Sequence, residues 1–189
     1  MAESGVPCRD SRDNRHDRTH CAITLHPILT QIPVMCPESG HAFRESGLPL
    51  QGAEAIVRGT LRLLLEMGFS PAPEVILDNG RRADLLAVDR KGSLLIVEVK
   101  SSVADFQSDR KWPDYLPHCD SFYFAVDTAF PAALIPESCG LMVADAYGAA
   151  IVRPALEQRL GPARRRAVTL RLARTAADRM ARQILPLAP

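Results

Sequence analysis

Residues 81–102, with the sequence RRADLLAVDRKGSLLIVEVKSS, constrain the fold more than any other part of the 189-residue chain. Two largely apolar runs, 82–89 and 93–100, have the length of strands and flank the short segment Arg90-Lys91-Gly92. A three-residue loop that ends in glycine is a common connection between antiparallel strands. The segment therefore predicts a β-hairpin.

The predicted turn also fixes which residues of the two strands face each other. It places Asp89 opposite Ser93, and counting outward along both strands places Asp84 opposite Glu98. Opposed residues project to the same face of a sheet, and Lys100, two residues beyond Glu98, points to that face as well. Two opposed carboxylates repel each other, so these charges need a partner or a use.

A divalent cation held between the two acids would account for them. Carboxylate oxygens and water are the ligands that Mg²⁺ prefers, and a lysine nearby can orient a water or neutralise charge that develops on a phosphate. We therefore expect Asp84 and Glu98 to bind Mg²⁺ or Mn²⁺ and to form a catalytic site with Lys100. The alternative is an ion pair of the three side chains at a sheet edge.

Helical and strand patterns alternate along residues 48–189, which we interpret as one α/β domain. Helices are expected within 51–69, at 102–112 before Pro113, and from about 163 to 185. Further short apolar runs predict strands at 73–78, 121–127, 141–146 and 149–154. This order predicts one central mixed sheet with helices on its faces.

Residues 1–47 differ in composition from the rest of the chain. They are rich in Arg, Asp, Ser, Pro and His and have no lasting periodicity, which predicts a mobile extension. The chain has no apolar run of membrane-spanning length and no apolar signal segment near its start, and its five cysteines form no CxxC pair. We expect a cytoplasmic protein without a membrane partner.

The net charge of +1 hides an asymmetry between the central part and the end of the chain. Residues 51–152 hold 9 basic and 14 acidic residues, whereas residues 153–189 hold nine arginines and only two acidic residues. A basic helix is suited to binding phosphates. The alternative is an ordinary solvated helix face.

Asp84 followed by Glu98-Val99-Lys100 on consecutive strands resembles the D…ExK signature of the PD-(D/E)XK nuclease superfamily. Ala83 departs from that signature, because many members have proline there. The predicted α-β-β-β-α-β order resembles the restriction-endonuclease-like core of the superfamily. The segment EVKSSVADFQSDRKWPDYLPHCDSFYFAVD resembles the MmcB family of bacterial DNA repair proteins, and this likeness runs from about residue 50 to 185.

The resemblance implies roles for individual residues. Asp84 and Glu98 would be metal ligands, the backbone carbonyl of Val99 would be a third, and Lys100 would position or activate the attacking water. Glu54 on the first helix would match a carboxylate that assists the metal in many members. The alternative for Glu54 is a surface ion pair with Arg58, four residues later on the helix.

Candidate DNA contacts lie in two places. Lys111 and Trp112 follow the motif, where the tryptophan can stack on a base or sugar, although packing in the core is the alternative. Asp105 and Asp109, one helical turn apart, form a like-charge pair that needs a nearby cation, for which Arg110 or Lys111 is available. The C-terminal candidates are Arg164, Arg165, Arg166 and Arg171.

These observations predict a magnesium-dependent DNA phosphodiesterase that acts on damaged or branched DNA, in the cytoplasm and associated with the nucleoid. The alternative is a catalytically inactive nuclease-fold module that binds DNA or docks partners in the DNA damage response. The expected partners are DNA, other repair or translesion-synthesis proteins, and a second copy of the chain in a homodimer.

Overall fold

The structure, a computed structural model, describes residues 50–185, so the predicted extension over residues 1–47 lies outside the described part. Its helices, including two 3-10 helices (η), and its strands are α1 (Ala53–Glu66), β1 (Ser70–Ile76), β2 (Arg82–Val88), β3 (Leu94–Lys100), α2 (Val103–Ser108), η1 (Trp112–His118), β4 (Ser121–Val126), η2 (Ala132–Leu134), β5 (Gly140–Ala144), β6 (Ala149–Arg153) and α3 (Pro162–Ile184).

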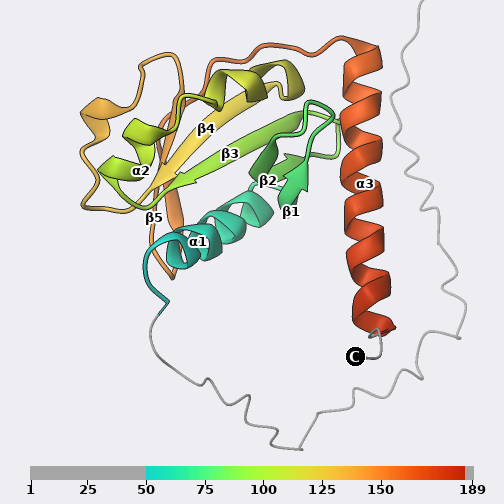
Figure 1. Cartoon of the computed structure of the whole chain (residues 1–189), viewed down its shortest axis with the longest axis horizontal. Coiled ribbons are helices and arrows are strands. Elements are labelled where there is room, and N and C mark those ends of the chain that lie inside the picture. Colours follow the sequence, from blue (N-terminus) through green and yellow to red (C-terminus); the bar gives the residue numbers. More distant parts are fainter. Residues whose placement is uncertain (1–49, 186–189) are drawn as a thin grey trace, which may run out of the picture. The chain divides into compact units, whose positions relative to one another are not determined.

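The strands form one six-stranded mixed sheet in the order β1-β2-β3-β4-β5-β6, with helices packed against it (Figure 1). β2 runs antiparallel to its neighbours β1 and β3, the strands β3, β4 and β5 run parallel, and β6 returns antiparallel to β5. The predicted α/β class and the mixed sheet are therefore confirmed.

Apolar side chains cover both faces of the sheet. On one face, Ile56 and Leu64 of α1 pack on the sheet with residues such as Val97 of β3. On the other face, residues of η1 and α3 pack against Ile96 of β3 and Phe124 of β4. Every residue of β3 is buried, which makes it the centre of the domain.

The β2–β3 hairpin has the predicted register. Leu86 pairs with Ile96, and Gly92 has a φ of 82°, the left-handed conformation expected at the end of the three-residue turn. The carboxylate of Asp89 accepts hydrogen bonds from two backbone N–H groups of the turn, at 2.8 and 2.7 Å. The local sequence of the turn is therefore sufficient to align the two strands.

The prediction of a helix over 102–112 is wrong for the second half of that range. It begins as expected after Ser102, whose hydroxyl accepts a hydrogen bond from the first turn at 3.1 Å, but α2 ends at Ser108. Asp109 has extended backbone angles, φ −93° and ψ 105°, and a separate 3-10 helix, η1, follows. The chain leaves the helix where the Asp109 side chain pairs with a lysine of the sheet.

α1 packs at very short range against the turn between β5 and β6. A Cβ atom added at Gly59 would lie 2.2 Å from the carbonyl oxygen of Asp145 and 2.3 Å from that of Gly148. The guanidinium of Arg62 donates to a third carbonyl of this turn, that of Tyr147, at 3.0 Å. Glycine is therefore required at this position of the helix by its neighbours.

We expect Gly59→Ala to lower the free energy of unfolding by about 2 kcal/mol, because the clash with backbone atoms outweighs the gain of roughly 1 kcal/mol in helix propensity. Urea denaturation measures the change. Gly161→Ala is a suitable control, since a Cβ there meets nothing within 4 Å. A Gly59→Ala variant more stable than the wild type would contradict the close approach.

Candidate active site

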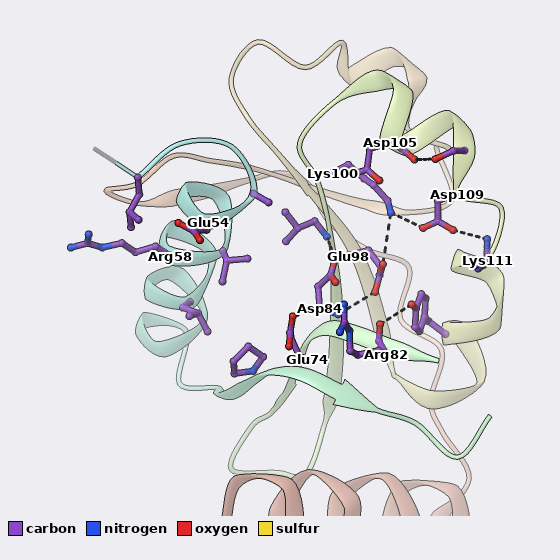
Figure 2. A pocket seen from close by; sticks show the side chains of 18 of the residues that line it. Glu54, Arg58, Glu74, Arg82, Asp84, Glu98, Lys100, Asp105, Asp109 and Lys111 are labelled. Carbon is purple, nitrogen blue, oxygen red and sulfur yellow. Dashed lines mark hydrogen bonds and ion pairs between the residues drawn. The ribbon is translucent and has the colours of Figure 1, made fainter. Parts of the chain in front are cut away.

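Asp84 and Glu98 lie against each other where the β2–β3 ladder ends, as predicted (Figure 2). The backbone N–H of Asp84 donates to Oε1 of Glu98 at 3.3 Å, and the N–H of Val99 donates to Oδ2 of Asp84 at 2.8 Å. Regular pairing of the strands ends at Leu85 and Val97, so these side chains bridge the strands beyond that point. Each carboxylate uses one oxygen in this bridge.

Both acids lie in surroundings that disfavour their charged forms. The Glu98 residue is 3% exposed, and Asp84 is half-buried. Burial, followed by the charge of Asp84, raises the pKa of Glu98 from 4.5 to about 8, and burial also raises the pKa of Asp84. A divalent cation between the two groups would favour their charged forms, because an opposite charge lowers the pKa of a carboxyl.

Lys100 is held mainly by Asp109. Its Nζ lies 2.6 Å from Oδ2 of Asp109 and 3.9 Å from Oε2 of Glu98. Burial acts to lower the pKa of Lys100, but the hydrogen bond and the charge of Asp109 outweigh it and raise the pKa above its usual value. The lysine is therefore an ammonium ion in this site.

The pairing of Asp109 was missed at the sequence level. We expected Asp105 and Asp109 on one helical face with Arg110 or Lys111 as the compensating cation, but Asp109 lies beyond the helix and pairs with Lys100. The two partners are nine positions apart in the sequence and belong to different parts of the fold, so no helical or strand spacing indicates the contact.

The acids and the lysine line a cavity of about 1130 Å³, with walls from α1, α2 and the strands β1, β2 and β3. Its charged lining consists of six acidic residues and five basic residues. The acidic ones are Glu54, Glu74, Asp84, Glu98, Asp105 and Asp109, and the basic ones are Arg58, Arg82, Lys100, Lys111 and Arg179. A phosphate that enters this cavity therefore needs further positive charge.

Glu54 lies in this cavity wall, but its side chain is exposed, and Figure 2 shows it on α1, apart from the pair of Asp84 and Glu98. Within residues 50–185, no group of three or more His, Cys, Asp and Glu residues is arranged to hold a metal ion. The described residues thus offer two adjacent carboxylates for a cation, and a metal-assisting role of Glu54 stays a prediction.

The two candidate DNA contacts after the motif differ in their surroundings. The ring of Trp112 stacks on Phe122 with centroids 5.9 Å apart and meets Phe124 edge-on at 6.0 Å, which is the core-packing alternative. Lys111 is exposed and lines the cavity. Of the two, Lys111 has the position expected of a phosphate contact.

Arg165 of α3 fastens this helix to the sheet. Its guanidinium forms two hydrogen bonds of 2.7 Å with the carboxylate of Asp120 and donates to the carbonyl of Gly92 in the hairpin turn. The Asp120 residue is 4% exposed and also accepts from the backbone N–H groups of Leu94 and Leu160, at 2.7 and 2.8 Å. Asp120 therefore joins β3, α3 and the segment before α3.

Other arginines of α3 also have intramolecular partners, which sequence reasoning did not predict. Arg164 pairs with Asp78 in the turn after β1. Arg171 donates to one backbone carbonyl of β1 at 3.2 Å, and Arg179 donates to two others. Arg166 is exposed. DNA contact by any of these arginines stays a prediction.

A family model described as "DNA repair protein MmcB-like" matches residues 42–186. The chain belongs to the MmcB-like family. The match confirms the resemblance and includes every helix and strand of the described fold. The family name associates the MmcB-like chain with DNA repair.

A solved structure of a protein of unknown function from Silicibacter pomeroyi is similar to this MmcB-like protein. The two are 43% identical, the match covers 75% of this chain and 97% of the other, and the TM-score is 0.71. A comparison with curated proteins finds no match. Among the helices that the structure describes, none has both the length and the apolar character that crossing a membrane requires.

Proposed function

We propose that this MmcB-like protein is a metal-dependent DNA phosphodiesterase that acts in repair. The main support is the placement of Asp84 and Glu98 against each other inside a cavity, with the charged Lys100 beside Glu98. The order α1-β1-β2-β3-α2-β4 supports a restriction-endonuclease-like core as the finer description of the fold. Damaged or branched DNA is the proposed substrate class.

The donor atoms fit a hard divalent cation such as Mg²⁺ or Mn²⁺. The hydrogen bonds that bridge the strands use Oδ2 of Asp84 and Oε1 of Glu98. They do not involve Oδ1 of Asp84 or Oε2 of Glu98, which are the oxygens proposed to bind the cation. Mg²⁺ usually takes only one or two carboxylates and keeps water and substrate phosphates as its other ligands, so two acids suffice. The backbone carbonyl of Val99 is the proposed third protein ligand.

The bound cation would polarise the phosphodiester and lower the pKa of a water molecule. Lys100, kept as an ammonium by Asp109, would hold the attacking water by hydrogen bonding and stabilise the negative charge that develops on the phosphate. As long as it is charged it has no free electron pair to accept a proton. Arg58, Arg82 and Lys111 of the cavity wall would contact neighbouring phosphates and fix the position of the strand.

We expect Asp84→Asn to lower the rate of DNA cleavage by more than about 10²-fold, because it removes a charged metal ligand. The assay uses labelled single-stranded, duplex, nicked, flapped and crosslinked DNAs with Mg²⁺ or Mn²⁺, and with EDTA in parallel. Calorimetric titration with Mn²⁺ should show weaker binding to the variant. Asp89→Asn is the matched control, since it makes the same change at the closed end of the same hairpin.

Two results would reject the proposal. One is cleavage by Asp84→Asn at the wild-type rate, and the other is cleavage that EDTA leaves unchanged. Salt-dependent DNA binding without cleavage of any substrate would instead favour the inactive DNA-binding or partner-docking module.

A further inference from the structure

We infer that Asp109 is a positioning residue whose carboxylate fixes the Lys100 ammonium beside Glu98 and prevents it from binding the Glu98 carboxylate directly. The inference deepens the proposed function and rests on it. It names a residue outside the D…ExK pattern, from the loop between α2 and η1, as a part of the site.

The two acids near Lys100 make unequal contacts with it. The distance of 2.6 Å to Asp109 is that of a short charge-assisted hydrogen bond, whereas the distance of 3.9 Å to Glu98 is too long for any hydrogen bond. The place of the ammonium is therefore set by Asp109. Glu98 lies to the side of the ammonium, without a hydrogen bond to it.

Asp109 is itself held rigidly, as a positioning residue must be. Its second carboxylate oxygen accepts from the backbone N–H of Lys111 at 2.8 Å, and its own N–H donates to the carbonyl of Phe106 at 3.2 Å. The Phe106 ring packs edge-on against Phe124 and Phe130, with centroids 5.4 and 6.1 Å away. The carboxylate is thus anchored to the core beneath it.

Without Asp109, the long side chain of Lys100 would be free to move toward its other acid. The lysine side chain has roughly 2 kcal/mol of rotamer entropy, and a buried ammonium without a partner is strongly unfavourable. Glu98 is the nearest other carboxylate, at 3.9 Å through Oε2. This is one of the two oxygens proposed for the cation, so an ammonium bound there would compete with the metal.

The chain allows a direct test in the metal-free protein, because it contains only three lysines, Lys91, Lys100 and Lys111. The protein is labelled with ¹³C at the lysine ε carbons and studied by NMR. An immobilised Lys100 should give two distinct chemical shifts for its two ε protons. These signals are assigned to Lys100 because they are absent from the spectrum of Lys100→Met. Asp109→Asn is expected to move or merge them. Asp105→Asn, which removes an equal charge from the same cavity wall, four residues earlier on α2, should leave them separate. Unchanged Lys100 signals in Asp109→Asn would overturn the inference, whether or not the protein cleaves DNA.

Binding and kinetic measurements extend the test. Asp109→Asn should weaken Mn²⁺ binding roughly 10-fold, and adding Lys100→Met to it should restore binding. The same single variant should lower kcat by about 10²-fold with little change in KM, since it misplaces a group of the site without removing a phosphate contact. In a Lys100→Met background, Asp109→Asn should have no further effect on kcat. Independent, multiplicative losses in kcat would contradict the inference.

Discussion

Glu98→Gln is expected to abolish DNA cleavage and, at the same time, to stabilise the metal-free protein. Cleavage should fall by about 10³-fold or more, because a neutral amide replaces a charged metal ligand. The free energy of unfolding should rise by about 1 to 3 kcal/mol, since the substitution removes first the cost of burying the Glu98 charge and second its repulsion with Asp84. The glutamine retains an oxygen that accepts the N–H of Asp84, as Oε1 of Glu98 does now.

The gain in stability of Glu98→Gln over the wild type should increase as the pH rises. The pKa of Glu98 is raised to about 8 in the folded protein, above its ordinary value, so the folded state binds an extra proton between these two values. The wild type therefore loses stability as the pH rises through this range. The advantage of Glu98→Gln should be small near pH 4 and largest above about pH 8.

Urea denaturation at several pH values in EDTA, together with the cleavage assay, measures both effects. Glu137→Gln is the matched control, because Glu137 is exposed and precedes β5 at the opposite end of the parallel strands from Lys100. A Glu98→Gln variant that cleaves normally, or that is less stable than the wild type in EDTA, would contradict our assignment of the site.

Asp120→Asn is expected to lower the free energy of unfolding by about 4 kcal/mol. The carboxylate is buried and accepts hydrogen bonds on both oxygens, from the guanidinium of Arg165 and from two backbone N–H groups. An amide cannot accept on both sides, so the variant leaves a donor without a partner and the Arg165 charge uncompensated. The main loss is the attachment of α3 to the start of β3.

The effect of Asp120→Asn should decrease in acid. Burial acts to raise the pKa of Asp120, but the hydrogen bonds from Arg165 and from the backbone outweigh it and lower the pKa. Such a carboxyl stabilises the fold fully above its unfolded pKa, near 3.9, and this contribution is lost as the pH falls through the lower folded value. The difference in the free energy of unfolding between wild type and variant should therefore shrink below about pH 4.

Denaturation curves at pH 7 and pH 3 test this pH dependence of Asp120→Asn, with Asp178→Asn on the exposed side of α3 as the control. An equal loss at both pH values would show that the charge is not the cause.

The part of the site that lies on the hairpin could be predicted because it depends on residues that are close together in the sequence. The turn at Gly92 sets the register of β2 and β3, and the register brings Asp84 and Glu98 together. The first turn of α2 was predictable for the same reason, from Ser102 as its capping residue.

The contacts that could not be predicted join residues that are far apart or follow no regular spacing. α2 ends early, and Asp109, the residue after it, pairs with a lysine on β3, whereas the predicted helix continued as far as Pro113. The composition of α3 predicted a basic helix, but it gave no means to separate an exposed arginine such as Arg166 from Arg165, whose acid partner is 45 positions earlier. The exposure of Glu54 could not be predicted either, because the burial of α1 begins one residue later, at Ala55.

The hydrogen bonds from α3 to β1 also bear on how the protein avoids aggregation. β1 is an outermost strand of the sheet, and such strands are templates on which another chain can add a strand of its own. Pro71 and Pro73 remove two backbone donors from this strand, and Arg171 and Arg179 occupy three of its carbonyls. The helix that we expected to bind DNA thus shields an edge strand from association with other chains.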